Sequence, residues 1–278
     1  MARMRAVLGI DAAWTLHNPS GVALAVDAGK GWRLVAAEAS YARFLARADG
    51  AAREARPTGS RPDPAALLAA AQKLAGAGIS LVALDMPLSR DPITGRRASD
   101  KAVSSAYGRQ KCATHAPSAE RPGRISDDLR AGFAALGYRL HTEGVSGRGI
   151  IEVYPHPALV ELAGASVRLP YKASRAGLYW PEASVEERRR RLLGQWRAIV
   201  ALLDDELAGA AEALRVPTLK ASGVDLKAFE DTLDAAICAW IAACALDGKC
   251  RAYGDPVSAV WVPSLLPKTL VSKRVARP

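Results

Sequence analysis

The order of the predicted elements indicates a mixed α/β sheet with helices packed on it. Three apolar runs near the start of the chain are separated only by turn signals, which predicts an antiparallel meander over residues 6–11, 22–26 and 32–37. Two further apolar runs, at 79–85 and 149–154, alternate with helical patterns. A meander followed by alternating helices and strands is typical of a sheet with both antiparallel and parallel strands.

Turn and capping residues define the elements in chain order. The turn cluster at 18–21 (NPSG) and the hairpin signal at 27–31 (DAGKG) separate the strands of the meander. Asp63 followed by Pro64 opens a predicted helix. The pattern at 126–136 predicts a second helix.

Later in the chain, Ser184 and Glu187 form a capping box that opens a long amphipathic helix. The turn at 254–256 precedes a short strand over 259–263. Residues 48–63 and 88–124 show no regular period, so they are predicted to be loops. The second loop is basic, with Arg90, Arg96, Arg97, Lys101, Arg109, Lys111, Arg121 and Arg124.

The last predicted helix carries an unusual charge pattern. Its apolar residues recur at helical spacing: Leu226, Phe229, Leu233, Ile237, Trp240 and Cys244. Asp231 and Asp234 are three apart and share a side of the helix, with Glu230 close by. Lys227 is a turn away, so no cation is expected among the three acids, and a divalent ion would relieve their repulsion. An ordinary solvated helix face is the alternative.

Composition indicates a soluble protein of basic character. The chain has 278 residues, of which 50% are hydrophobic, and a net charge of +10, which weakly favours a polyanionic partner. Its four cysteines form no C-x-x-C pair, which predicts reduced, buried thiols. No signal peptide or membrane-spanning run is visible, so a cytoplasmic location without membrane contact is expected. We expect one domain over 1–265, with a helical insertion at about 164–222 and a mobile basic tail over 266–278.

The carboxylates at the strand ends suggest a common site. Asp11 and Asp85 each end a predicted strand, and ligands of open α/β sheets bind at such ends. If the two strands are neighbours, these acids lie roughly 5 Å apart. The acidic helix would bring Asp231 and Asp234 to the same point. Four carboxylates suit Mg²⁺ or Mn²⁺, and two such ions can hydrolyse a phosphodiester bond. Taken singly, an aspartate that ends a strand is more often a cap or turn former.

These features resemble the ribonuclease-H-like superfamily, and in particular its crossover-junction endonuclease branch. The chain is more similar still to the family catalogued as domain of unknown function 429, described as predicted nucleases. The matching motifs are Gly9-Ile10-Asp11, Leu84-Asp85-Met86-Pro87, Arg97-Ala98-Ser99-Asp100, Glu152-Val153-Tyr154-Pro155, Glu230-Asp231-Thr232-Leu233-Asp234-Ala235, Gly254-Asp255-Pro256 and Trp261-Val262-Pro263. The family often has a histidine where this chain has Phe229.

The resemblance implies a five-stranded ribonuclease-H-like sheet and a metal-dependent nuclease with two Mg²⁺ or Mn²⁺ ions. Its metal-binding and catalytic positions correspond to Asp11, Asp85, Asp231 and Asp234. The partner would be nucleic acid of undefined type, and the oligomeric state is left open.

Five further residues are candidates for the site, and each has a structural alternative. Glu152 and Glu230 are additional acids, although Glu152 is equally suited to capping the following turn. Arg97 and Asp100 are spaced for an ion pair, with a phosphate contact by Arg97 as the alternative. His156 suits a general acid or base, but a structural surface histidine is the more common case.

Two other functions compete with the nuclease. A non-catalytic binding module on the same fold would need no metal and would tolerate Asp-to-Asn changes. An actin-like or sugar-kinase-type phosphotransferase also carries an aspartate on its first strand, but such proteins use glycine-rich phosphate hairpins. Here Asp11 is followed by Ala12-Ala13-Trp14, which contains no glycine.

Overall fold

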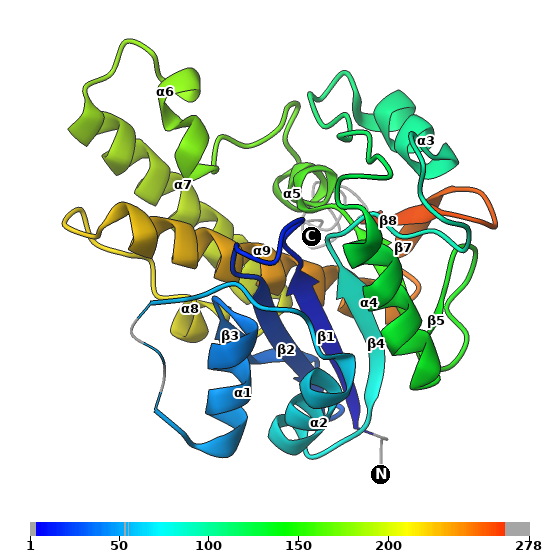
Figure 1. Cartoon of the computed structure of the whole chain (residues 1–278). Helices are drawn as coiled ribbons and strands as arrows, with labels where there is room; N and C mark the ends of the chain where they lie inside the picture. Colours follow the sequence, from blue (N-terminus) through cyan, green and yellow to red (C-terminus); the bar gives the residue numbers. More distant parts are fainter. Residues whose placement is uncertain (1–3, 53, 55, 265–278) are drawn as a thin grey trace, which may run out of the picture.

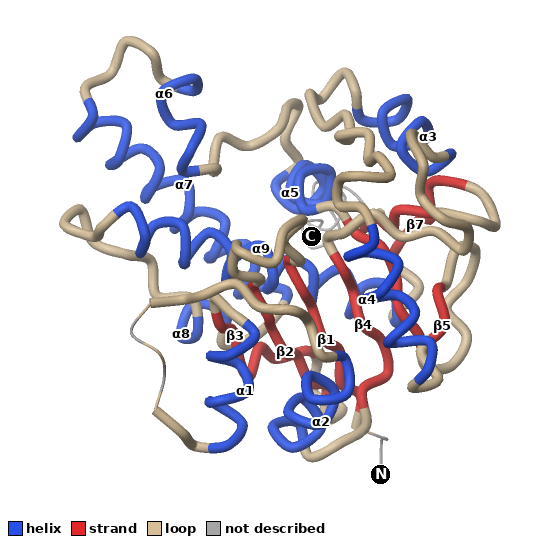
Figure 2. The backbone as a smooth tube through the Cα atoms, in the orientation of Figure 1, coloured by secondary structure: helices blue, strands red, loops and turns tan. Residues whose placement is uncertain are grey.

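A mixed β-sheet forms the centre of the protein (Figures 1 and 2). The computed structural model describes residues 4–52, 54 and 56–264. Within these residues the sheet has eight strands in the order β3-β2-β1-β4-β6-β8-β7, with β5 paired to β6. The strands are β1 Arg5–Asp11, β2 Gly21–Asp27, β3 Trp32–Glu38, β4 Ile79–Leu84, β5 Arg139–Leu140, β6 Gly149–Val153, β7 Cys250–Gly254 and β8 Ala259–Pro263.

The pairing confirms a sheet of mixed direction. Strands β1, β2 and β3 form an antiparallel meander, and β7 runs antiparallel to β8. The pairs β1–β4, β4–β6 and β6–β8 are parallel. The expected count of five strands is wrong for the described residues. Strand β5 has only two residues and β7 lies at an edge with a half-exposed pattern, so neither carries a clear hydrophobic period.

Helices cover both faces of the sheet. They are α1 Tyr41–Asp49, α2 Pro64–Ala75, α3 Ala98–Tyr107, α4 Arg124–Ala135, α5 Pro155–Ala163, α6 Ala176–Tyr179, α7 Val185–Glu206, α8 Ala210–Ala213 and α9 Gly223–Leu246. Residues Ala173–Arg175 form a short 3₁₀ turn. Three helices were not expected from the sequence, namely α1, α3 and α5. Helix α5 begins with Pro155-His156-Pro157, which looks like a strand end, although proline also fits the first turn of a helix.

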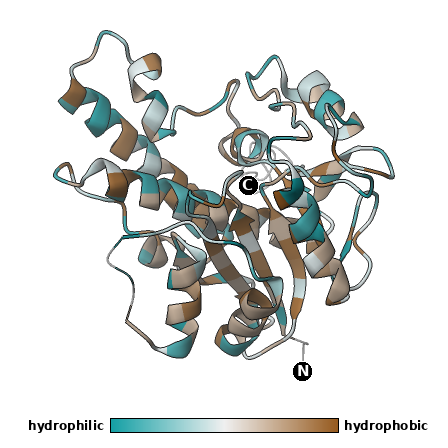
Figure 3. Cartoon of the chain, viewed as in Figure 1, coloured by the Kyte–Doolittle hydropathy of each residue, from teal (hydrophilic) through white to brown (hydrophobic). Residues whose placement is uncertain are grey.

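Alternate residues of the central strands build two separate cores. Val7 of β1 packs with α5, α7 and α9, whereas Leu8 and Ile10 pack with α1, α2 and α4. In Figure 1, α9 crosses behind β1 and β2, and α1, α2 and α4 lie in front of the sheet. Figure 3 shows apolar residues concentrated on the strands and polar residues on the outer loops and helices. The sheet is therefore the middle layer of three.

Several local predictions are confirmed. Asp63 caps α2 by accepting hydrogen bonds from two backbone N–H groups, and Ser184 caps α7 by accepting one from the N–H of Glu187. The stretch 164–222 contains the helices α6, α7 and α8, and its role as an insertion stays a prediction. The four cysteines are free, and all but the half-buried Cys250 are buried. The predicted basic tail, 266–278, lies outside the described residues. None of the described helices combines the length and apolarity needed to cross a bilayer.

Candidate metal centre

Asp11 and Asp85 lie side by side at the same edge of the sheet. Asp11 is the last residue of β1, and Asp85 follows the last residue of β4. The two strands are parallel neighbours with Ile10 opposite Leu84, and the Asp85 N–H donates to the Ile10 carbonyl at 2.9 Å. Because both strands end here, the two carboxylates share one position in the fold. The two strands are therefore adjacent, which is the condition on which the predicted common site depends.

Helix α9 brings a second set of acids to this edge because small residues let it approach the sheet. A Cβ atom at Gly9 would lie 2.2 Å from the backbone nitrogen of Ala239, and one at Gly21 would lie 2.0 Å from the carbonyl oxygen of Asp231. Any larger residue at these two positions would force the helix away from β1 and β2. Glycine thus sets the depth at which Asp231 meets the strand ends.

The acids of α9 are buried, so the alternative of a solvated helix face is wrong. Glu230, Asp231 and Asp234 are 3%, 2% and 0% exposed. Asp231 joins Asp11 and Asp85 in lining a pocket of about 600 Å³, whereas Asp234 is not part of its lining. The Oδ2 atom of Asp231 is buried and has no hydrogen-bond partner among the described residues.

Two lysines neutralise the acids of α9, contrary to the expectation that no cation lies among them. Lys227 contacts the Oδ1 atom of Asp231 and lies 3.2 Å from the Oε1 atom of Glu230. Its long side chain spans the turn that separates it from these acids. Lys172 contacts the Oδ2 atom of Asp234 and lies 3.6 Å from the same Glu230 oxygen. It stands 62 residues before Asp234, so no local sequence pattern predicts this contact.

Three consecutive residues, Tyr171, Lys172 and Ala173, attach the insertion to α9, and we call them the 171–173 strap. The Tyr171 hydroxyl donates to the Oδ1 atom of Asp234 at 2.8 Å. The Ala173 N–H donates to Glu230 at 2.6 Å, and the Trp196 indole N–H of α7 donates to the Tyr171 carbonyl at 2.7 Å. The contacts of Tyr171 and Ala173, on either side of Lys172, thereby hold its ammonium group against α9.

Burial and mutual repulsion shift the acids of the pocket toward their neutral forms. Burial, followed by the charges of Asp234 and Asp231, raises the pKa of Asp11 well above its ordinary value. Burial and the charge of Asp234 raise the pKa of Asp85 to about 7. Burial also raises the pKa of Asp231 to about 6, against the opposing effect of Lys227. Burial disfavours the charge of Lys172, but the charges led by Asp234 outweigh it and raise its pKa.

The donor atoms of Asp11, Asp85 and Asp231 in the acidic pocket suit a divalent cation. Carboxylate oxygens are the ligands that Mg²⁺ and Mn²⁺ prefer, and an ion would relieve the repulsion that raises the pKa of Asp11. The unpartnered Asp231 oxygen is one such donor. The side chains are not arranged as finished ligands, because no group of three His, Cys, Asp or Glu residues in the described ranges has metal-binding geometry.

Glu152, Arg97 and Asp100 form a separate buried cluster that holds the loop after Asp85. The Arg97 guanidinium pairs with Glu152 at 2.5 Å and with Asp100 at 2.8 Å, so the predicted ion pair is confirmed. Leu88, three residues beyond Asp85, donates its N–H to Glu152 at 2.7 Å and accepts from Arg97 at 2.7 Å. The guanidinium is therefore occupied by carboxylates and a carbonyl rather than directed at a phosphate.

His156 is not the surface histidine that its position between two prolines suggests. It is 6% exposed and packs between the rings of Tyr154 and Tyr171, each 5.3 Å from its own. Burial, with the charge of Lys172, lowers its pKa well below the ordinary value. It does not line the acidic pocket, and its link to the site runs through Tyr171, which binds Asp234.

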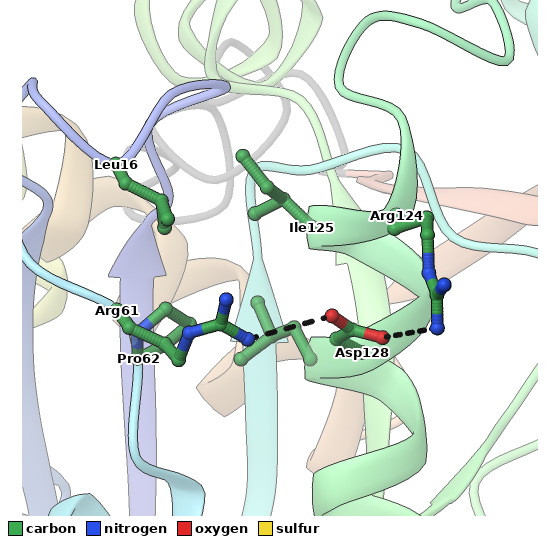
Figure 4. Close-up of a pocket in the computed structure, with 7 residues that line it drawn as sticks. Leu16, Arg61, Pro62, Arg124, Ile125 and Asp128 are labelled. Carbon is green, nitrogen blue, oxygen red and sulfur yellow. Dashed lines mark ion pairs between the residues drawn. The ribbon is translucent and has the colours of Figure 1, made fainter.

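Basic residues surround the β1–β2 loop (residues 12–20), which forms one wall of the acidic pocket. His115 and Arg121 line that pocket, and the Arg121 guanidinium lies 5.9 Å from the centre of the Trp14 ring. A neighbouring pocket of about 530 Å³ lies against Leu16 of the same loop (Figure 4). There, Arg61 and Arg124 approach Asp128 from opposite sides, at 3.7 and 4.0 Å. The sequence indicated a basic loop at 88–124 but not which of its cations reach the site.

Comparison with known proteins identifies a family but no described relative. The family described as "Protein of unknown function (DUF429)" matches residues 9–258, most of the chain, so the resemblance predicted from the motifs is confirmed. No curated protein and no solved structure matches the chain.

Proposed function

The chain belongs to the DUF429 family, and we propose that it is a metal-dependent nuclease that hydrolyses phosphodiester bonds at the pocket of Asp11, Asp85 and Asp231. One observation carries the proposal. Three carboxylates from three different elements converge on one pocket, and one of them has a buried oxygen without a partner among the described residues. Asp231 is buried and Asp11 and Asp85 are partly buried, and acids grouped in this way are costly unless cations balance them.

The topology supports this proposal. The antiparallel meander β3-β2-β1 continued by the parallel strands β4 and β6 is the arrangement expected of a ribonuclease-H-like core. Helix α9 then packs across the ends of β1 and β4, as the resemblance implies for the helix that carries paired acids. The strands β7 and β8 extend the sheet beyond that core.

The residues have different roles in the proposed reaction. Asp11, Asp85 and Asp231 would hold Mg²⁺ or Mn²⁺. The chemistry supplied by such an ion would be activation of a water molecule and stabilisation of the charge that develops on the phosphate. Lys227 holds Asp231 in place, and the Glu152–Arg97 pair fixes the loop that follows Asp85.

The cations near the pocket favour a nucleic-acid substrate. Arg121 lies on the pocket wall, with Arg61 and Arg124 in the adjoining pocket, so a phosphate backbone would meet positive charge on its way to the acids. The net charge of +10 acts in the same direction.

A panel of labelled substrates tests this function. Single-stranded RNA, single-stranded DNA, an RNA–DNA hybrid and a four-way junction are incubated with the protein in Mg²⁺, Mn²⁺ or EDTA. We expect cleavage of at least one substrate only with metal, and a loss of about 100-fold or more in Asp11→Asn and Asp85→Asn. The exposed Asp49, paired with Lys73, supplies the matched control Asp49→Asn, which should cleave normally. Cleavage that survives EDTA, or that both pocket variants retain, would overturn the proposal.

A non-catalytic binding module is the second candidate, and the two lysines favour it. Asp231 and Asp234 are already neutralised by Lys227 and Lys172, so these two acids have partners without a metal. This function predicts nucleic-acid binding that is the same in EDTA and in Mn²⁺, with no cleavage of any substrate in the panel.

A further inference from the structure

The acids of the site fall into two groups. Asp11, Asp85 and Asp231 line the pocket and form the open half of this acidic centre, and Asp234 beside Lys172 forms the closed half. The two halves differ in the groups that contact their carboxylate oxygens. We infer that the site takes one divalent ion, at Asp11, Asp85 and Asp231, and that the ammonium group of Lys172 takes the place of a second ion beside Asp234. This inference rests on the proposed metal-dependent function. It differs from the two-ion expectation, which assigns Asp234 as a metal ligand.

Both carboxylate oxygens of Asp234 contact the 171–173 strap. Its Oδ1 atom accepts the Tyr171 hydroxyl at 2.8 Å, and its Oδ2 atom contacts the Lys172 ammonium group. The residue is 0% exposed and does not line the pocket. For Asp234 to bind an ion, the ammonium group would have to leave, and a buried lysine without its partner is strongly unfavourable.

Lys172 is held in place by more than its own ion pair. The residues on either side of it are fixed, because the Tyr171 carbonyl accepts from Trp196 and the Ala173 N–H donates to Glu230. Its side chain is only 20% exposed. The strap therefore positions a fixed positive charge rather than a mobile surface lysine.

The open half has the opposite character. Asp231 uses one oxygen for Lys227, whose side chain is 57% exposed, and keeps its buried Oδ2 atom without a partner among the described residues. Asp11 and Asp85 line the same pocket. Within the described residues, the Lys227 ammonium group contacts one oxygen of this half and leaves the Oδ2 atom of Asp231 available to a cation.

Mn²⁺ stoichiometry decides between one ion and two. Calorimetric titration of the full chain with MnCl₂ alone should give one Mn²⁺ per chain. Asp11→Asn should abolish this binding, whereas Asp234→Asn should retain it, because Asp234 is not a ligand of that ion. Binding is measured in the absence of nucleic acid, so the result does not depend on activity.

Variants of Lys172 test its role directly. Lys172→Met keeps most of the side-chain volume but removes the charge, which frees the Oδ2 atom of Asp234, and we expect a second Mn²⁺ per chain. Lys172→Arg keeps the charge and should still bind one. If Lys172→Met fails to fold, the native stoichiometry and Asp234→Asn still decide the question.

Three results would overturn the inference. Two Mn²⁺ per native chain, falling to one in Asp234→Asn, would restore the two-ion site while leaving the proposed nuclease intact. A folded Lys172→Met variant that still binds one ion would show that Lys172 does not replace a second. No Mn²⁺ binding by the native chain would remove the inference and the metal-dependent function together.

Discussion

Two charge clusters lie at the ends of neighbouring strands, and they differ in how completely their acids are paired. In the Arg97–Asp100–Glu152 cluster, the guanidinium contacts both carboxylates, and the Leu88 N–H completes the contacts of Glu152. In the pocket beside it, Asp231 has one oxygen in contact with Lys227 and another without a hydrogen-bond partner among the described residues. Glu152 and Asp231 are both buried, so the two clusters differ in the partners of their acids rather than in burial.

The largest effect is expected in the fully paired cluster. Glu152→Gln would leave Arg97 buried with only Asp100 to balance its charge, so the free energy of unfolding should fall by about 3–5 kcal/mol. Urea denaturation measures this change, with the exposed Glu182→Gln as control. A loss below about 1 kcal/mol would mean that the pair contributes little, and the contrast between the two clusters would disappear.

A smaller loss is expected at the closed half of the acidic centre. Asp234→Asn removes the charge that Lys172 contacts but keeps a side chain able to accept from Tyr171, so stability should fall by roughly 2–4 kcal/mol. Repulsion between unpaired acids would have predicted the opposite sign. Thermal unfolding in EDTA distinguishes the two, since a stabilised variant would show that the lysine does not balance Asp234.

In the open half, replacing Asp85 should increase the free energy of unfolding, and the increase should depend on pH. The pKa of Asp85 is about 7 in the folded protein and 3.8 ordinarily, so the folded state binds this proton more tightly than the unfolded state. Its contribution to stability therefore falls as pH rises from about 4 to about 7. Asp85→Asn lacks this titration.

We expect the variant to gain roughly 1–3 kcal/mol relative to the native protein across this pH range, with little change above it. Urea denaturation in EDTA at pH 4 to 8 measures the difference. Saturating Mn²⁺ should reverse the order by stabilising only the native protein. A difference between the two proteins that is constant with pH would contradict the raised pKa.

The smallest effect concerns the basic wall of the pocket. If Arg121 contacts one phosphate, Arg121→Ala should reduce the slope of log affinity against log salt by about 1. Fluorescence anisotropy with a labelled oligonucleotide at several salt concentrations measures the slope. Arg33, which pairs with Glu212 away from this pocket, supplies the control Arg33→Ala. Equal slopes in both variants would show that Arg121 does not contact a phosphate of the substrate.

The sequence by itself determined those features that depend on neighbours along the chain. The buried strands follow from their apolar runs, and the caps at Asp63 and Ser184 act within three residues. The spacing of Asp231 and Asp234 likewise places both on one side of a helix. These interactions are local, so pattern and residue type are sufficient to predict them.

Only the tertiary structure decided which charges meet. The pairing of β1 with β4 brings Asp11 to Asp85, the glycines at 9 and 21 set the depth of α9, and the strap carries Lys172 to Asp234 across 62 residues. The same holds for Glu152: its position in the sequence makes it a candidate site acid, and the fold pairs it with Arg97. A charged side chain acquires its role from the groups it meets after folding, because Coulomb energy and desolvation depend on distance in space rather than along the chain.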